Sequence, residues 1–139
     1  MGNVQSMRKI NFEDMQTATK NIETYLIINT LSSTDQQCLI KGTVGLEQEE
    51  AIVNKYIKEN KGIKIIIYGK NNHDDLVHKK YQQLVALGFQ NVYAYTGGIF
   101  EWLLLQDIYG CEIFPTSKKE LDLLRYKPAP ILNISLLTN

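Results

Sequence analysis

The residues best placed to do chemistry lie in a short polar loop near the middle of the chain, Gly69-Lys70-Asn71-Asn72-His73. The loop follows an apolar run at 63–68 that predicts a strand buried on both faces, and it precedes a helix expected to begin near Asp74. Where a parallel strand passes into a helix, the backbone N–H groups of the loop converge and the helix dipole favours negative charge. A cysteine there would lose its proton readily and become a nucleophile. The loop contains no cysteine, and its first residue, Gly69, has no side chain.

The other residues that could bind a metal or react are few. The chain has two cysteines, Cys38 and Cys111, which form neither a Cys-x-x-Cys pair nor a disulfide framework. Two histidines, His73 and His78, give no cluster of metal ligands. We therefore expect no metal site and no cofactor.

Strands and helices alternate along the sequence that surrounds the loop. Predicted strands cover 25–28, 38–40, 63–68 and 92–95, and predicted helices cover 11–20, 46–59, 74–87 and 97–105. The helix after the loop is expected to bury its apolar residues, which are Leu76, Val77, Tyr81, Leu84 and Val85. This alternation predicts a mostly parallel sheet in a three-layer α/β domain.

The segments that follow the loop resemble one family in particular. Gly88-Phe89, Asn91-Val92-Tyr93 and Gly97-Gly98-Ile99-Phe100-Glu101-Trp102 occur in the order found in the rhodanese-like domain. The resemblance covers about residues 8–109 and implies a three-layer α/β fold in which Trp102 anchors the core. Active members carry a sulfur atom, as a persulfide, on a cysteine at the first loop position. The matching position here is Gly69.

Two further departures agree with a loss of sulfur chemistry. Asp74 and Asp75 lie at the far end of the loop, where active relatives usually carry small or basic residues, and their charge would repel anionic substrates. The family's early Leu-Ile-Asp-Val-Arg strand end reads here as 26–30, Leu-Ile-Ile-Asn-Thr. The resemblance therefore implies a catalytically inactive member, and we expect it to act as a binding or scaffold module in a larger assembly.

Two alternatives remain open. The chain would be a sulfurtransferase if Cys38, Cys111 or a partner's cysteine served as the nucleophile, although the segment after Cys38 has a packing role in the family and a buried thiol is usually inert. It would be a small-anion sensor if the loop from Gly69 through His73 bound an anion, with Lys70 and His73 supplying the side chains.

The last thirty residues differ in composition from the rest. Residues 110–139 contain all three prolines, two helix-compatible pieces (118–124 and a weak one after Ile131) and too many apolar side chains for a solvated tail. We expect a partly irregular extension that packs on the domain or docks a protein partner. On this interpretation, deleting residues 110–139 abolishes docking and leaves the core folded.

Composition narrows the remaining possibilities. A chain of 139 residues suits one domain, expected at 10–109, and the balance of 15 basic and 15 acidic residues gives no electrostatic basis for binding nucleic acid. We expect a cytoplasmic protein that can associate with a membrane or an assembly, with a flexible N-terminus at 1–9. Met1-Gly2-Asn3-Val4-Gln5-Ser6 fits the pattern for myristoylation of Gly2, and we expect membrane contact only if Gly2 is acylated.

Overall fold

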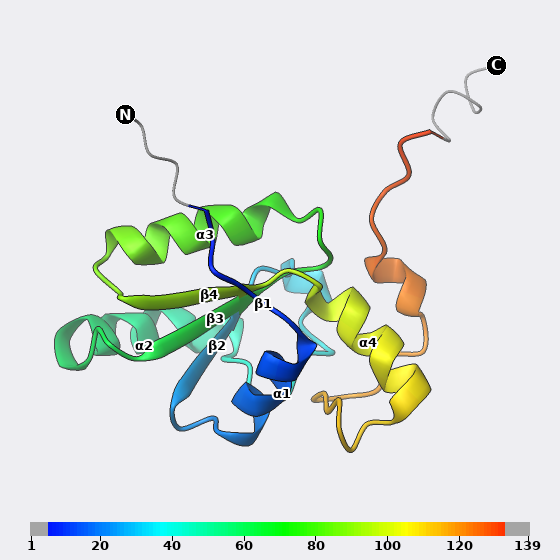
Figure 1. Cartoon of the computed structure of the whole chain (residues 1–139), viewed down its shortest axis with the longest axis horizontal. Helices are drawn as coiled ribbons and strands as arrows, with labels where there is room; N and C mark the ends of the chain where they lie inside the picture. The colour runs from blue at the N-terminus through cyan, green and yellow to red at the C-terminus, as the bar shows by residue number, and fades with distance from the viewer. Residues whose placement is uncertain (1–5, 133–139) are drawn as a thin grey trace.

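The computed structural model describes residues 6–132 and contains one four-stranded parallel sheet (Figure 1). The strands lie in the order β1-β4-β3-β2, and they are β1 (Lys9–Ile10), β2 (Tyr25–Asn29), β3 (Lys64–Tyr68) and β4 (Asn91–Tyr95). Four α-helices connect or follow them, which are α1 (Phe12–Lys20), α2 (Leu46–Glu59), α3 (Asp75–Ala86) and α4 (Gly98–Tyr109). Two short 3₁₀ turns are η1 (Ser33–Asp35) and η2 (Leu123–Tyr126).

The sheet is covered on both faces, which confirms the three-layer α/β fold. Ile66 and Tyr68 of β3 pack with α1 and α4 on one face, whereas Ile65 and Ile67 pack with α2 and α3 on the other (Figure 1). All four side chains are buried, because a central parallel strand has no face in contact with water. The unbroken apolar run in the sequence was therefore interpreted correctly.

Several helix boundaries follow from local signals in the sequence. The Asn11 side chain accepts a hydrogen bond from the Asp14 N–H (3.0 Å), and α1 ends at Lys20 as predicted. The prediction of a helix at 46–59 is confirmed by α2. The helix expected at 97–105 also forms, but it continues to Tyr109. Gly110, which has a φ of 100°, ends it there.

Three local predictions were wrong. Residues 38–40 form no strand, because Ile40 makes only an isolated antiparallel bridge to Thr116. Residues 118–124 form no α-helix, and only the η2 turn appears there. In α3, Leu76 and Val85 are 51% and 39% exposed, because Val77, Tyr81 and Leu84 already turn the helix's buried face toward the sheet.

The segment after α4 contributes to the main core. Phe114 and Tyr126 are at most 2% exposed. Phe114 makes an edge contact with the ring of Trp102, which is fully buried. The Trp102 Nε1–H donates to the carbonyl of Pro115 (3.1 Å). Removing residues 110–139 would therefore strip large apolar groups from the core, contrary to the expectation that this deletion spares it.

Some sequence predictions fall outside the described residues. These include Gly2, with its candidate acylation, and the helix-compatible piece that continues beyond Leu132. Within 6–132, no helix combines the length and the apolar character needed to cross a bilayer.

Candidate functional site

The predicted loop lies where β3 ends, at the edge of the sheet to which the carboxyl ends of all four parallel strands point. β3 ends at Tyr68, Gly69 is buried, and Asp74 caps the N-terminus of α3. In parallel α/β sheets this edge is the usual location of binding sites. The sequence therefore placed the loop correctly in the fold.

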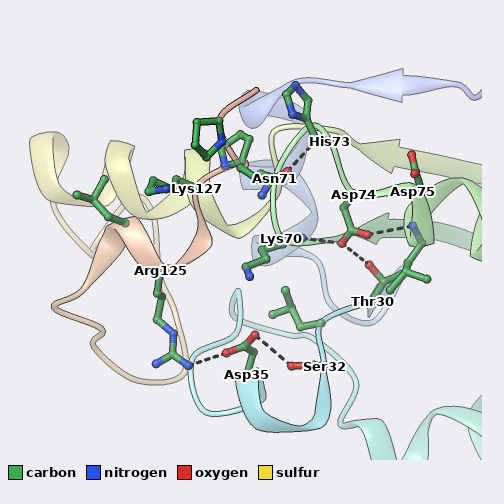
Figure 2. A pocket seen from close by; sticks show the side chains of 16 residues that line it. Thr30, Ser32, Asp35, Lys70, Asn71, His73, Asp74, Asp75, Arg125 and Lys127 are labelled. Atoms are coloured by element: carbon green, nitrogen blue, oxygen red, sulfur yellow. Dashed lines mark hydrogen bonds and ion pairs between the residues drawn. The ribbon is translucent and has the colours of Figure 1, made fainter. Parts of the chain in front are cut away.

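One of the protein's own carboxylates, that of Asp74, accepts hydrogen bonds from the loop. Asp74 Oδ2 accepts hydrogen bonds from the Lys70 backbone N–H (3.0 Å) and from the Thr30 hydroxyl (3.1 Å). Asp74 Oδ1 accepts from the Leu76 N–H (3.0 Å), inside the first turn of α3. Figure 2 shows the carboxylate pointing back toward Lys70 and Thr30. The Lys70 N–H, the Thr30 hydroxyl and the Leu76 N–H are thus all bonded to Asp74.

The same carboxylate occupies the space that a side chain at residue 69 would need. A Cβ atom built on Gly69 would collide with Asp74 Oδ2, and it would lie 2.7 Å from both Thr30 Oγ1 and Val77 Cγ2. Real Cβ atoms do not approach other heavy atoms so closely, so all three neighbours, or the loop itself, would have to move. Glycine at position 69 and aspartate at position 74 therefore fit each other.

The opposite side of the loop is closed by the start of α4. The N–H groups of Ile99 and Phe100 donate to the carbonyls of Gly69 (2.9 Å) and Lys70 (3.0 Å). Gly98 has a φ of 69°, and a Cβ atom there would lie 2.7 Å from the Gly69 carbonyl oxygen. The N–H groups of Ile99 and Phe100, in the first turn of α4, are thus bonded to the loop and are not free to bind a ligand.

Asn71 joins the loop to the C-terminal segment. Its side chain is buried; Nδ2 donates to the Tyr126 carbonyl (2.8 Å), and Oδ1 accepts from the His73 N–H (2.9 Å). Asn72 and His73 themselves are exposed on the rim. The contact between Asn71 and Tyr126 could not be predicted, because no local pattern marks a contact between residues so distant along the chain.

A cleft of about 610 Å³ opens beside the loop. It lies between the loop with the first turn of α3 on one side and residues 124–130 on the other, and residues 30–35 form part of its lining (Figure 2). Lys70 and His73 from the predicted site line this cleft, and Arg125 and Lys127 line it from the C-terminal segment.

Neither cysteine lies in the loop. Cys38 is buried and its thiol donates to the Lys118 carbonyl (3.2 Å), and burial raises the pKa of this thiol above its usual value. Burial therefore favours the protonated thiol of Cys38 over the thiolate, which is the reactive form. Cys111 is exposed and follows the C-terminal end of α4. The loop contacts the N-terminal end of this helix, and 12 helical residues separate the two ends by about 18 Å.

No set of side chains in the described part of the chain has the composition of a metal site. A search of residues 6–132 finds no group of three or more histidine, cysteine, aspartate or glutamate residues placed to hold an ion. His73 lies on the rim of the cleft and His78 lies on α3, on separate parts of the surface.

Comparisons with known proteins point to one family. The sequence model described as "Rhodanese-like domain" matches residues 14–105, and no curated protein matches. The structure of the Alr3790 protein from Anabaena sp. has a TM-score of 0.57 at 19% identity, with 84% of each chain covered. The BH2092 protein from Bacillus halodurans has a TM-score of 0.57 at 16% identity, covering 93% of this chain and 89% of that one.

A third solved structure carries a stated activity. The single-domain sulfurtransferase RDL2 from Saccharomyces cerevisiae has a TM-score of 0.53 at 12% identity, covering 81% of this chain and 99% of its own. At such low identities these likenesses concern the fold alone.

Proposed function

The chain belongs to the rhodanese-like domain family, and we propose that it is a catalytically inactive member that acts as a binding or scaffold module in a larger assembly. The family includes sulfurtransferases. The sequence motifs lead us to expect Gly69 at the position of the family's nucleophilic cysteine, and glycine has no atom that can carry a sulfur. On this proposal the chain keeps the fold of the family and lacks the group that would attack a substrate.

The observation that carries this proposal is the position of the Asp74 carboxylate. It accepts hydrogen bonds from the Lys70 N–H and the Thr30 hydroxyl, and it fills the volume next to Gly69. An anionic sulfur donor would have to displace a carboxylate that is covalently part of the chain. The loop therefore lacks both the nucleophile and a vacant place for the substrate's charge.

The C-terminal segment is the part of the molecule we propose for docking a protein partner. Leu121, Leu124 and Ile131 project large apolar side chains that are 82%, 61% and 76% exposed. Several exposed apolar residues in one segment are typical of a surface that a partner covers. The two free thiols agree with a reducing, cytosolic location, and acylation of Gly2 would add membrane contact.

The alternative, a sulfurtransferase with a non-standard cysteine, is tested by a direct assay. The purified chain is incubated with thiosulfate and cyanide, and thiocyanate is measured. We expect the wild type and the Cys38→Ser/Cys111→Ser double variant to match the background without protein. Turnover by the wild type that the double variant loses would contradict the proposal.

A further inference from the structure

Residues 118–130 form an irregular strap that passes beside α4 (Figure 1) and supplies, through residues 124–130, one wall of the cleft (Figure 2). Just before the strap, the Ser117 N–H donates to the Leu39 carbonyl (2.8 Å), which is a backbone hydrogen bond to the body of the domain. Within the described chain, the backbone–backbone hydrogen bonds of the strap itself are internal and lie around η2. Neither a strand ladder nor a shared helix therefore ties the strap to the sheet.

The middle of the strap is attached at one place. Tyr126 is 1% exposed, and it is the one buried side chain among residues 118–130, all of which the structure describes. The Tyr126 carbonyl accepts a hydrogen bond from Asn71 Nδ2 (2.8 Å), and Arg125 pairs with Asp35 (2.6 Å). The Arg125 side chain is 37% exposed, so water screens this ion pair. A segment with so few buried contacts opens at a lower cost in free energy than the core does.

The strap also covers the Cys38 thiol. Cys38 is 2% exposed, and its thiol donates to the carbonyl of Lys118, the first residue of the strap (3.2 Å). Cys38 and Tyr126 belong to the same buried cluster. If the strap moved away from the domain, the thiol would lose both its hydrogen-bond acceptor and the ring that helps to shield it from water.

We propose that residues 118–130 open as a unit, pivoting at Ser117, while the sheet and its helices stay folded. The open form uncovers the Cys38 thiol and removes one wall of the cleft. It leaves the loop at 69–73 accessible at the carboxyl edge of the sheet, where parallel α/β domains bind their ligands. The closed form restricts access to both. This conformational device goes beyond the proposed function, and it would operate whether or not the chain is catalytically inactive.

The labelling rate of Cys38 measures the open form. In the Cys111→Ser background Cys38 is the single thiol of the chain, and mass spectrometry follows its reaction with iodoacetamide. When opening and closing are fast, the observed rate equals the rate for the unfolded chain multiplied by the open fraction. We expect this rate to change little at low urea concentrations, because a local opening exposes much less surface than global unfolding does.

Three variants in this background separate local opening from global unfolding. Asn71→Ala removes the donor to the Tyr126 carbonyl and should speed labelling about tenfold, and Tyr126→Ala should speed it about a hundredfold. Ile67→Val is the control, because Ile67 is buried on the opposite face of the sheet, among the side chains of α2 and α3. It should lower the urea midpoint of unfolding and leave the labelling rate unchanged. If circular dichroism shows that Tyr126→Ala is unfolded, Asn71→Ala decides.

Three results would overturn the inference. Ile67→Val could speed labelling by the same factor as it raises the unfolding constant, which would mean that only global unfolding exposes Cys38. The labelling rate could rise with urea as steeply as the unfolding constant does. Asn71→Ala could label at the wild-type rate, which would mean that the strap contact does not protect the thiol. The thiocyanate assay is independent of these outcomes, so failure of this inference and failure of the proposed inactivity can be told apart.

Discussion

At the scale of single residues, Asp74 and Asp75 show how neighbouring, chemically identical side chains take different roles. Asp74 caps the N-terminus of α3 through the Leu76 N–H, at the point where the sequence predicted a helix to begin. The second oxygen of Asp74 turns back to the loop and to Thr30, whereas Asp75 is exposed. A capping rule relates residues within one turn of helix. It could not predict the contact with Thr30, which follows β2 and lies far from Asp74 along the chain.

Replacing Asp74 should therefore cost more stability than replacing Asp75. We expect Asp74→Ala to lower the free energy of unfolding by about 2 kcal/mol, because it removes the helix cap and leaves the Lys70 N–H and the Thr30 hydroxyl without their acceptor. Asp75→Ala, the matched control, should cost less than about 0.5 kcal/mol. Urea denaturation followed by circular dichroism measures both, and equal losses would contradict the role given to Asp74.

The same variant has a second readout. With the carboxylate removed, the loop N–H groups become available to an external anion, so sulfate should raise the melting temperature of Asp74→Ala more than that of the wild type. A wild-type protein stabilised by sulfate as strongly as the variant would support the small-anion sensor instead.

At the scale of elements, the first turn of α4 holds the loop through backbone hydrogen bonds. The sequence predicted the start of this helix but not its contact with the loop. Gly97-Gly98 indicated where β4 would pass into a helix. In the structure, Gly98 lets α4 approach so closely that its next two amides bond to the loop carbonyls of Gly69 and Lys70. The close approach depends on two segments that are neighbours only after folding.

Gly98 and Gly110 form a matched pair for testing this close approach. Both have a positive φ, but a Cβ atom at Gly98 would meet the Gly69 carbonyl oxygen at 2.7 Å, whereas nothing lies within 4 Å of one at Gly110. We expect Gly110→Ala to lower the free energy of unfolding by about 1 kcal/mol from backbone strain alone. Gly98→Ala should lose about 3 kcal/mol or more, because steric overlap adds to the strain. Denaturant titrations compare them, and similar losses would show that the loop and α4 can separate without cost.

Elements with a strong local pattern were predictable, and those defined by distant contacts were not. The capping residues predicted the position of α1, and the apolar run predicted the position of β3. Residues 38–40 looked like a strand because they are apolar, yet they are buried against the C-terminal segment, where Ile40 bridges Thr116. The place of the loop between β3 and α3 could be predicted. The contacts of Tyr126 and the cleft wall at 124–130 could not, because they link residues far apart in the chain.

At the scale of the whole molecule, the C-terminal segment completes the core on the face of the sheet covered by α1 and α4. Phe114 and Tyr126 belong to the same buried cluster as Trp102, Tyr95 and Cys38. The family match ends at residue 105, before the first of these C-terminal contacts. The C-terminal segment thus has two structural roles: Phe114 and Tyr126 complete this core, and residues 124–130 form one wall of the cleft.

Burial of titratable groups in this cluster predicts a loss of stability at alkaline pH. Burial raises the pKa of Tyr126 to about 12, and burial also raises the pKa of the Cys38 thiol and of the Tyr68 and Tyr95 phenols. The folded state holds these protons at pH values where the unfolded chain has released them. Their contribution is therefore complete below about pH 9 and declines as the pH rises from there toward about 12.

The urea midpoint should accordingly be lower at about pH 11 than at about pH 8. Tyr126→Phe keeps the ring and removes the titrating hydroxyl, so its midpoint should fall less over this window than that of the wild type. If the urea midpoints of the two proteins fell equally with pH, Tyr126 would not contribute to the pH dependence. A wild-type midpoint independent of pH would contradict the burial of the four titratable groups, which are Cys38, Tyr68, Tyr95 and Tyr126.

The most direct test of the central claim, that no group at this loop carries sulfur, is the intact mass of the protein after exposure to thiosulfate. Mass spectrometry under non-reducing conditions detects the gain of one sulfur atom, and peptide mapping locates it. We predict an unchanged mass for the full chain. A stoichiometric sulfur on Cys38 or Cys111 that cyanide removes as thiocyanate would show that the protein is a working sulfurtransferase.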